Sequence, residues 1–205
     1  MKPRHIGLAV ALVLAAVLAV AISPIGARLL KGEPQQAALV GGPFQLVDQD
    51  GRPVDEKILN GKWSAVFFGF TFCPDACPTT LSGLAQTEAL LGPQARTFQT
   101  VFISLDPARD TPAQMKAYIS NDAFPKALIG LTGTPAQTDA AAKTYRVFHQ
   151  KSGDGPDYLI DHSVVTYLMD PKGRFVCALP HGITPDQTAD RIKKAMREGP
   201  GAQAC

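Results

Sequence analysis

Residues 63–70 form a nearly continuous apolar run, and this run constrains the fold more than any other feature of the chain. An apolar stretch of this length without alternating polar residues is typical of a strand that is buried on both faces of a sheet. Residues 79–91 follow with apolar side chains at helical spacing. A buried strand that leads directly into such a helix predicts an α/β fold.

The same alternation of strand and helix continues along the chain. Further strands are expected at residues 44–47, 98–105, 127–131, 164–168 and 174–179, and further helices at residues 112–120, 135–145 and 184–197. The last two strands flank Asp170-Pro171-Lys172-Gly173, a turn sequence that predicts a hairpin. This order predicts an α/β sandwich around a mixed central sheet.

The N-terminus carries an apolar run that does not fit this sandwich. Residues 6–22 are Ala, Val, Ile or Leu except for Gly7, and no charge occurs from residue 6 to residue 25. Such a stretch is long enough to cross a membrane, which favours a transmembrane anchor over residues 1–25. Ala19-Val20-Ala21 also fits a cleavage site, so a removed signal peptide is the alternative. Residues 26–42 are expected to link this segment to a domain over residues 43–205.

Both interpretations export the domain. The segment lacks the Arg- and Ser-rich character of a mitochondrial leader, so we expect a bacterial inner membrane protein. The distribution of Lys and Arg favours a single pass with the N-terminus in the cytoplasm and the domain in the periplasm. A net charge of +2 with 19% charged residues excludes a disordered polyelectrolyte and gives no sign of nucleic-acid binding.

Two of the four cysteines lie between the first buried strand and the first helix. Cys73 and Cys77 are four residues apart, so at a helix start they share one face, and a helix N-terminus stabilises thiolates. The pair fits a redox disulfide, two soft ligands for a metal such as Cu(I), or a static disulfide. Its place after a buried strand favours a functional role. Structural zinc is disfavoured because it needs four ligands, and no second close Cys/His pair exists.

The remaining two cysteines are interpreted as bystanders. Cys177 lies in a strand pattern, which predicts a buried and inert thiol. Cys205 is the last residue and is expected to be disordered or to form an intermolecular disulfide. Asp106, Arg109 and Asp110 have two interpretations, either ion pairs that hold the loop below the cysteines or simply the approach to the helix at residue 112.

The cysteine motif is part of a longer pattern. Residues 68–80 (FGFTFCPDACPTT) closely resemble the core motif of the Sco/SenC proteins. Residues 104–112 (SLDPARDTP) resemble a second signature of that family, and residues 158–163 (YLIDHS) with 167–171 (YLMDP) resemble a third. Phe72 stands where the family often has a histidine, which we interpret as a local packing variation.

This resemblance implies a thioredoxin-like fold behind one N-terminal transmembrane helix. It also implies that Cys73, Cys77 and His162 bind copper as Cu(I), and as Cu(II) with a further donor. The implied function is that of a copper metallochaperone, not an enzyme in the usual sense, which delivers copper to the Cu-A centre of cytochrome c oxidase subunit II. Another copper carrier or a thiol reductant is the further expected partner.

A thiol–disulfide oxidoreductase is the alternative function, and a redox or copper sensor is a third. The oxidoreductase would use Cys73 and Cys77 to reduce cysteines of the Cu-A site or of other envelope proteins; only the copper hypothesis requires His162. His162 lies 85 residues after Cys77, so only the fold can bring them together. We expect residues 153–157 to form a loop before it, and Asp161 to accept a hydrogen bond from its second ring nitrogen.

Overall fold

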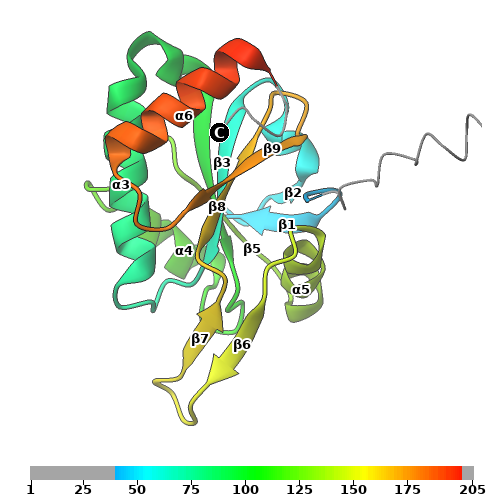
Figure 1. Cartoon of the computed structure of the whole chain (residues 1–205). Coiled ribbons are helices and arrows are strands. Elements are labelled where there is room, and N and C mark those ends of the chain that lie inside the picture. Colours follow the sequence, from blue (N-terminus) through cyan, green and yellow to red (C-terminus); the bar gives the residue numbers. More distant parts are fainter. Residues whose placement is uncertain (1–39, 200–205) are drawn as a thin grey trace, which may run out of the picture. The chain divides into compact units, whose positions relative to one another are not determined.

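A seven-stranded mixed sheet forms the centre of residues 40–199, the part of the chain that the computed structural model describes. Its strands are β1 (Gln45–Asp48), β2 (Pro53–Asp55), β3 (Trp63–Gly69), β4 (Phe98–Ser104), β5 (Ile129–Thr132), β8 (Val165–Met169) and β9 (Phe175–Pro180). Their spatial order is β2-β1-β5-β4-β3-β8-β9. Strands β3, β4 and β5 run parallel, and the other neighbours pair antiparallel (Figure 1). The predicted mixed sheet is therefore confirmed.

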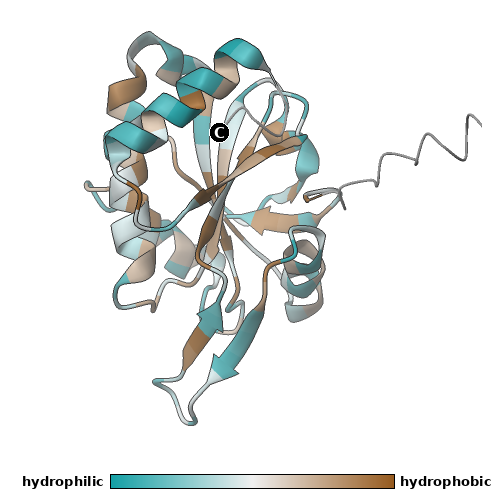
Figure 2. Cartoon of the chain, viewed as in Figure 1, coloured by the Kyte–Doolittle hydropathy of each residue, from teal (hydrophilic) through white to brown (hydrophobic). Residues whose placement is uncertain are grey.

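Helices cover both faces of this sheet. They are α3 (Ala76–Leu91), α4 (Pro112–Ile119), α5 (Pro135–Thr144) and α6 (Pro185–Glu198), with short 3-10 helices η1 (Glu56–Leu59) and η2 (Gly92–Thr97). Helices α3, α4 and α6 pack on one face and α5 on the other. Ala65 and Phe67 of β3 point to the first face, and Val66 and Phe68 to the second. All four are fully buried, and Figure 2 shows apolar residues along the strands of the sheet.

Three helices begin with the same local device. Thr111, Thr134 and Thr184 are N-caps, each followed by Pro, and each accepts a hydrogen bond from the backbone N–H three residues on. These signals are local, so the sequence predicts the starts of α4, α5 and α6 to within a residue. Helix α3 has no side-chain cap and begins at Ala76, three residues before the predicted start.

The sequence did not predict a second, two-stranded sheet. It consists of β6 (His149–Ser152) and β7 (Leu159–His162), which pair antiparallel and project from the main body (Figure 1). Residues 153–157, expected to be a loop, connect the two strands. Every residue of β6 is polar, so the strand shows no alternation of apolar and polar side chains.

Cys177 does not behave as predicted. It is half-buried in β9 and takes part in a disulfide, so it is not an inert buried thiol. Strand alternation indicates which face a side chain occupies, but it does not show how well an edge strand such as β9 is covered. Cys205 lies outside the described residues, as do the predicted anchor over residues 1–25 and most of the predicted linker over residues 26–42. Within residues 40–199 no helix is long and apolar enough to cross a membrane.

Candidate metal centre

Cys73 and Cys77 lie at the junction of β3 and α3. Both are free thiols; Cys73 is half-buried and Cys77 is fully buried. The backbone N–H of Cys77 donates to Cys73 Sγ over 3.4 Å. Because Asp75 makes no side-chain cap bond, the Cys73 sulfur itself satisfies one of the unpaired N–H groups at the start of α3. The helix N-terminus therefore faces the sulfur directly, as the spacing of the two cysteines predicts.

The pKa values of the two thiols are shifted in opposite directions. A hydrogen bond from the Cys77 thiol lowers the pKa of Cys73 to about 3, and smaller contributions from His162 and from backbone N–H groups act in the same direction against burial. The same hydrogen bond and the burial of Cys77 raise the pKa of that second thiol. Cys73 is therefore the thiolate at neutral pH, and Cys77 holds the proton that must leave before both sulfurs can bind one metal ion.

Gly69 makes room for the Cys77 sulfur. A Cβ atom at this position would lie 2.6 Å from Cys77 Sγ and 2.9 Å from Cε2 of Phe102, and both distances are shorter than real contacts. The sequence patterns did not single out this residue. Its signal was a glycine at the end of an otherwise bulky buried strand, which marks a close approach of neighbouring atoms.

His162, the last residue of β7, reaches the cysteine pair. The ring lies close enough to the Cys73 sulfur to lower the pKa of that thiol, and it is edge-on to Phe67 and Phe70, with centroids 6.4 and 6.1 Å away. Its Nδ1 donates to the carbonyl oxygen of Ser163 over 3.0 Å. A carbonyl can only accept, so Nδ1 keeps a proton and Nε2 is the nitrogen that a metal can take.

Asp161 is not the acceptor that the sequence suggested for this ring. Its side chain is exposed, and successive side chains of a strand point to opposite faces, so β7 turns Asp161 away from the side on which His162 lies. The backbone carbonyl of Ser163 takes that role instead.

The structure thus places both Cys77 and His162 near Cys73. Even so, no three His, Cys, Asp or Glu side chains in residues 40–199 already form a group that could hold a metal ion. A metal would have to draw the three side chains onto one point. Two sulfurs and one imidazole form a soft donor set, which suits Cu(I) better than hard cations.

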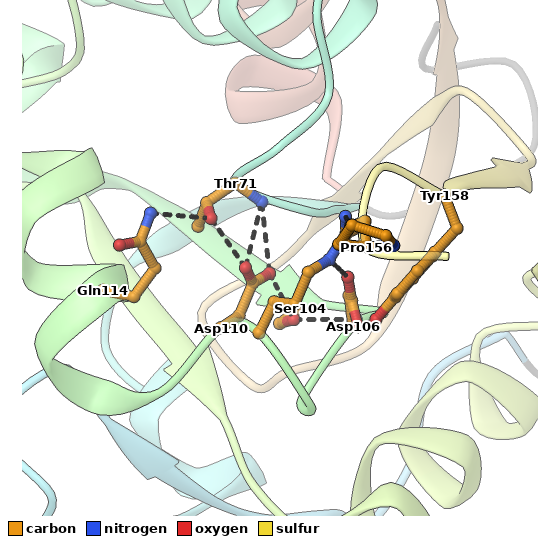
Figure 3. Close-up of polar contacts among 8 residues, drawn as sticks. Thr71, Ser104, Asp106, Asp110, Gln114, Pro156 and Tyr158 are labelled. Carbon is orange, nitrogen blue, oxygen red and sulfur yellow. Dashed lines mark hydrogen bonds and ion pairs between the residues drawn. The ribbon is translucent and has the colours of Figure 1, made fainter. Parts of the chain in front are cut away.

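Thr71, two residues before Cys73, is held by a buried carboxylate (Figure 3). Asp110 is fully buried and accepts hydrogen bonds from the Thr71 backbone N–H (3.1 Å), the Thr71 hydroxyl (2.6 Å) and the Ser104 hydroxyl (2.6 Å). Burial raises the pKa of Asp110. Of the predicted ion pairs, only that between Asp106 and Arg109 is present in the described part of the chain, with Nε and Oδ2 2.5 Å apart.

Phe72 is not packed into the fold. Its side chain is 49% exposed beside Cys73, and the guanidinium carbon of Arg109 lies 4.7 Å from its ring centre. A cavity of about 580 Å³ extends between α3 and the loop after β9. His181 lies at this cavity, where its Nδ1 is 3.2 Å from the Thr80 hydroxyl.

Comparison with known proteins places the chain in a family. The SCO1/SenC family pattern matches residues 32–197. The chain belongs to the SCO1/SenC family. Protein SenC of Rhodobacter capsulatus is 41% identical over 164 residues, which cover 79% of this chain and 73% of SenC. Mitochondrial SCO1 homolog 1 of Arabidopsis thaliana is 41% identical over 170 residues, or 82% of this chain. The chain spans only 50% of that relative and 60% of yeast mitochondrial SCO2.

Solved Sco structures share the fold. The crystal structure of Arabidopsis thaliana ScoI with copper bound is 42% identical, with a TM-score of 0.73, and the match covers 78% of this chain and 99% of that one. Bradyrhizobium japonicum ScoI with copper bound is 44% identical, with a TM-score of 0.68, over 75% of this chain and 98% of that one. The Sco-type, thioredoxin-like fold that the resemblance implied is confirmed.

Proposed function

We propose that this Sco protein binds copper through Cys73, Cys77 and His162 and acts as a metallochaperone in the assembly of cytochrome c oxidase. The observation that carries the proposal is that Cys77 and His162 both lie close enough to Cys73 to lower the pKa of its thiol, and that the Cys77 backbone N–H donates to the Cys73 sulfur. Two Sco proteins of similar sequence have been solved with copper bound. Copper is the cargo of this site, which must therefore both take it up and release it.

Each side chain has a distinct part in copper uptake. Cys73 offers a thiolate without losing a proton at neutral pH. Cys77 gives up its proton when its sulfur joins the site, and Nε2 of His162 completes a three-coordinate arrangement. Three protein ligands leave the metal open on one side, so a recipient's ligand can approach before the donor's ligands leave.

Delivery to the Cu-A centre of cytochrome c oxidase subunit II is the finer part of the proposal. The apolar run in residues 1–25 supports a membrane anchor, with the domain on the periplasmic side of a bacterial inner membrane. An anchor of this kind would hold residues 43–205 near a membrane-embedded recipient, with residues 26–42 as the linker.

Copper titration of the full-length chain tests the ligand set. We expect the reduced native chain to bind one Cu(I) per molecule in competition with a chelator. His162→Ala should weaken this binding about 10- to 100-fold, and Cys73→Ser/Cys77→Ser should abolish it. His149 lies directly opposite His162 in the β6–β7 pairing. His149→Ala therefore serves as the matched control, and its copper affinity should equal that of the native chain. Native affinity in His162→Ala would refute the proposal.

A thiol–disulfide oxidoreductase is the second candidate, because the thiols are arranged as an attacking and a resolving cysteine. The lowered pKa of Cys73 and the buried, protonated Cys77 are typical of such pairs. This activity would reduce cysteines of the Cu-A site or of other envelope proteins, and it would not need His162. Disulfide reduction that persists in His162→Ala, together with native copper affinity in that variant, would favour this alternative.

A further inference from the structure

The loop between β4 and α4, residues 105–111, contacts both segments that carry the proposed ligands. Toward the cysteines, Asp110 holds Thr71 through its backbone N–H and its hydroxyl (Figure 3). The loop is itself closed, because the backbone N–H groups of Arg109 and Asp110 both donate to the carbonyl oxygen of Asp106, over 3.2 and 2.9 Å. A segment that binds Asp106 or Arg109 is therefore linked, through Asp110, to Thr71 and the segment that carries the cysteines.

On the side of His162, residues 105–111 form hydrogen bonds with the hairpin of β6 and β7. The Tyr158 hydroxyl donates to Asp106 Oδ1 over 2.6 Å, and Arg109 Nη1 donates to the carbonyl oxygen of Pro156 over 3.1 Å. The guanidinium carbon of Arg109 also lies 3.6 Å from the centre of the Tyr158 ring. Figure 3 shows Pro156 and Tyr158 above Asp106 in this arrangement.

The Asp106–Arg109 pair lies largely out of water, whereas the hydrogen bond from Arg109 to Pro156 is exposed. Asp106 is 3% exposed, the side chain of Arg109 is 16% exposed, and the two form an ion pair. Hydrogen bonds to charged groups are stronger than neutral ones, and shielding from solvent strengthens them further. The contact of Asp106 and Arg109 with the β6–β7 hairpin is therefore well defined and is not a transient surface pair.

Tyr158 and His162 are joined by β7. This strand comprises Leu159–His162 and begins immediately after Tyr158. A paired strand is extended and stiff, so the position of Tyr158 determines where the His162 ring can lie relative to Cys73.

We propose that Asp106, Arg109 and Tyr158 are positioning residues for the copper site: by holding the hairpin against the loop that also holds Thr71, they set the distance between His162 and Cys73. The inference rests on the proposed function. It concerns residues outside the ligand set, and it assigns to the Asp106–Arg109 pair a role in metal affinity beyond a role in stability.

Tyr158→Phe tests this inference, because it removes one hydroxyl and keeps the ring under Arg109. We expect the Cu(I) affinity of the reduced full-length chain to fall about tenfold, as measured by chelator competition. In the His162→Ala background the same change should leave the remaining copper affinity unchanged, because the Tyr158–Asp106 contact affects copper binding only through the His162 ring. A merely structural role would lower the melting temperature in both backgrounds and would not depend on His162.

Tyr145→Phe is the matched control. The Tyr145 hydroxyl is buried and has no hydrogen-bond partner within residues 40–199, so its loss should leave copper affinity unchanged. Arg109→Lys keeps the charge beside Asp106 but loses the stacking on Tyr158, and it should weaken copper binding as Tyr158→Phe does. If the native chain binds copper through His162 while Tyr158→Phe and Arg109→Lys bind it equally well, the positioning role is wrong. If the native chain binds no copper, the proposed function itself fails.

Discussion

At the scale of single residues, the two cysteines of the motif differ although the sequence shows them as a symmetrical pair. Cys73 faces the N-terminus of α3 and receives hydrogen bonds, whereas Cys77 is buried and donates one. The hydrogen bond between the two thiols, together with the burial of Cys77, therefore decides which sulfur carries the charge.

This difference predicts the pH dependence of alkylation. Iodoacetamide should label Cys73 of the reduced, metal-free chain at nearly the same rate from pH 5 to pH 8, because a pKa of about 3 keeps this sulfur ionised over the whole range. The buried Cys77 should remain unlabelled. An ordinary thiol, with a pKa of about 8.5, would react roughly tenfold more slowly for each pH unit below that value.

The variant Cys77→Ala gives the matched comparison for this labelling. It removes the hydrogen bond that lowers the pKa of Cys73 most, so labelling at pH 5 should slow while labelling at pH 8 changes less. A native chain whose labelling rate climbs steeply from pH 5 to pH 8 would contradict the assignment of Cys73 as the thiolate. Mass spectrometry of the modified peptides measures both outcomes.

Gly69 carries a second prediction at this scale. Gly69→Ala should lower the free energy of unfolding by about 1–3 kcal/mol and weaken copper binding, because the new methyl group would occupy the place of the Cys77 sulfur. Gly83→Ala, in α3, is the control: no atom lies within 4 Å of its added Cβ, and the change should stabilise the helix by about 0.5–1 kcal/mol. Chemical denaturation and copper competition, done together, measure both effects. Equal behaviour of the two variants would show that Gly69 is not needed for space.

At the scale of elements, the ends of β3 and β4 are joined by buried hydrogen bonds rather than by apolar packing. Asp110, which follows β4, accepts from Thr71 after β3 and from Ser104 at the end of β4. Because the two strands are parallel neighbours, their carboxyl ends meet at one edge, and one carboxylate can serve both. This edge is where open α/β sheets place functional sites.

Removing that carboxylate should loosen both strand ends. Asp110→Ala should lower the free energy of unfolding by on the order of 3 kcal/mol, because it leaves the Thr71 N–H and the Ser104 hydroxyl buried without an acceptor. Asp122→Ala is the control, since Asp122 is fully exposed and its ion pair within residues 40–199 is with an exposed lysine; no change is expected there. Urea denaturation distinguishes the two, and equal stability of both variants would show that the buried bonds contribute little.

At the scale of the whole molecule, three distant parts of the chain converge on one site. Cys73 and Cys77 follow β3, the loop of residues 105–111 follows β4, and His162 ends β7. Copper bound across such segments should stabilise the folded chain as a unit, because the unfolded chain does not hold the three proposed ligands together.

This coupling predicts a redox-dependent stabilisation. At free Cu(I) about 100-fold above the dissociation constant, the reduced chain should gain about 2.7 kcal/mol in the free energy of unfolding. The chain oxidised at Cys73 and Cys77 should gain nothing, because a disulfide lacks the thiolates that bind Cu(I). The variant Cys73→Ser/Cys77→Ser should behave like the oxidised chain. Thermal unfolding measures this stabilisation. If copper stabilises the reduced and oxidised chains equally, it binds elsewhere.

The sequence by itself determined the features that depend on short-range patterns. These are the buried strands, the capped helix starts, the hairpin of β8 and β9, and the cysteine pair between a strand and a helix. The family motifs added two expectations, that His162 is a copper ligand and that the fold is thioredoxin-like. Such features are readable because residues within a few positions of one another already contain the physical cause, whether apolar spacing or a capping side chain.

Only the tertiary structure decided what depends on partners far apart in the chain. It pairs the polar β6 with β7, gives the Nδ1 proton of His162 to Ser163, and makes Cys73 the thiolate. It also replaces the expected free thiol of Cys177 with a disulfide. Asp106 meets Tyr158 across 52 residues, and no local pattern encodes such a contact. Hydrogen bonds and burial depend on which surfaces meet, and that is known only once the sheet has assembled.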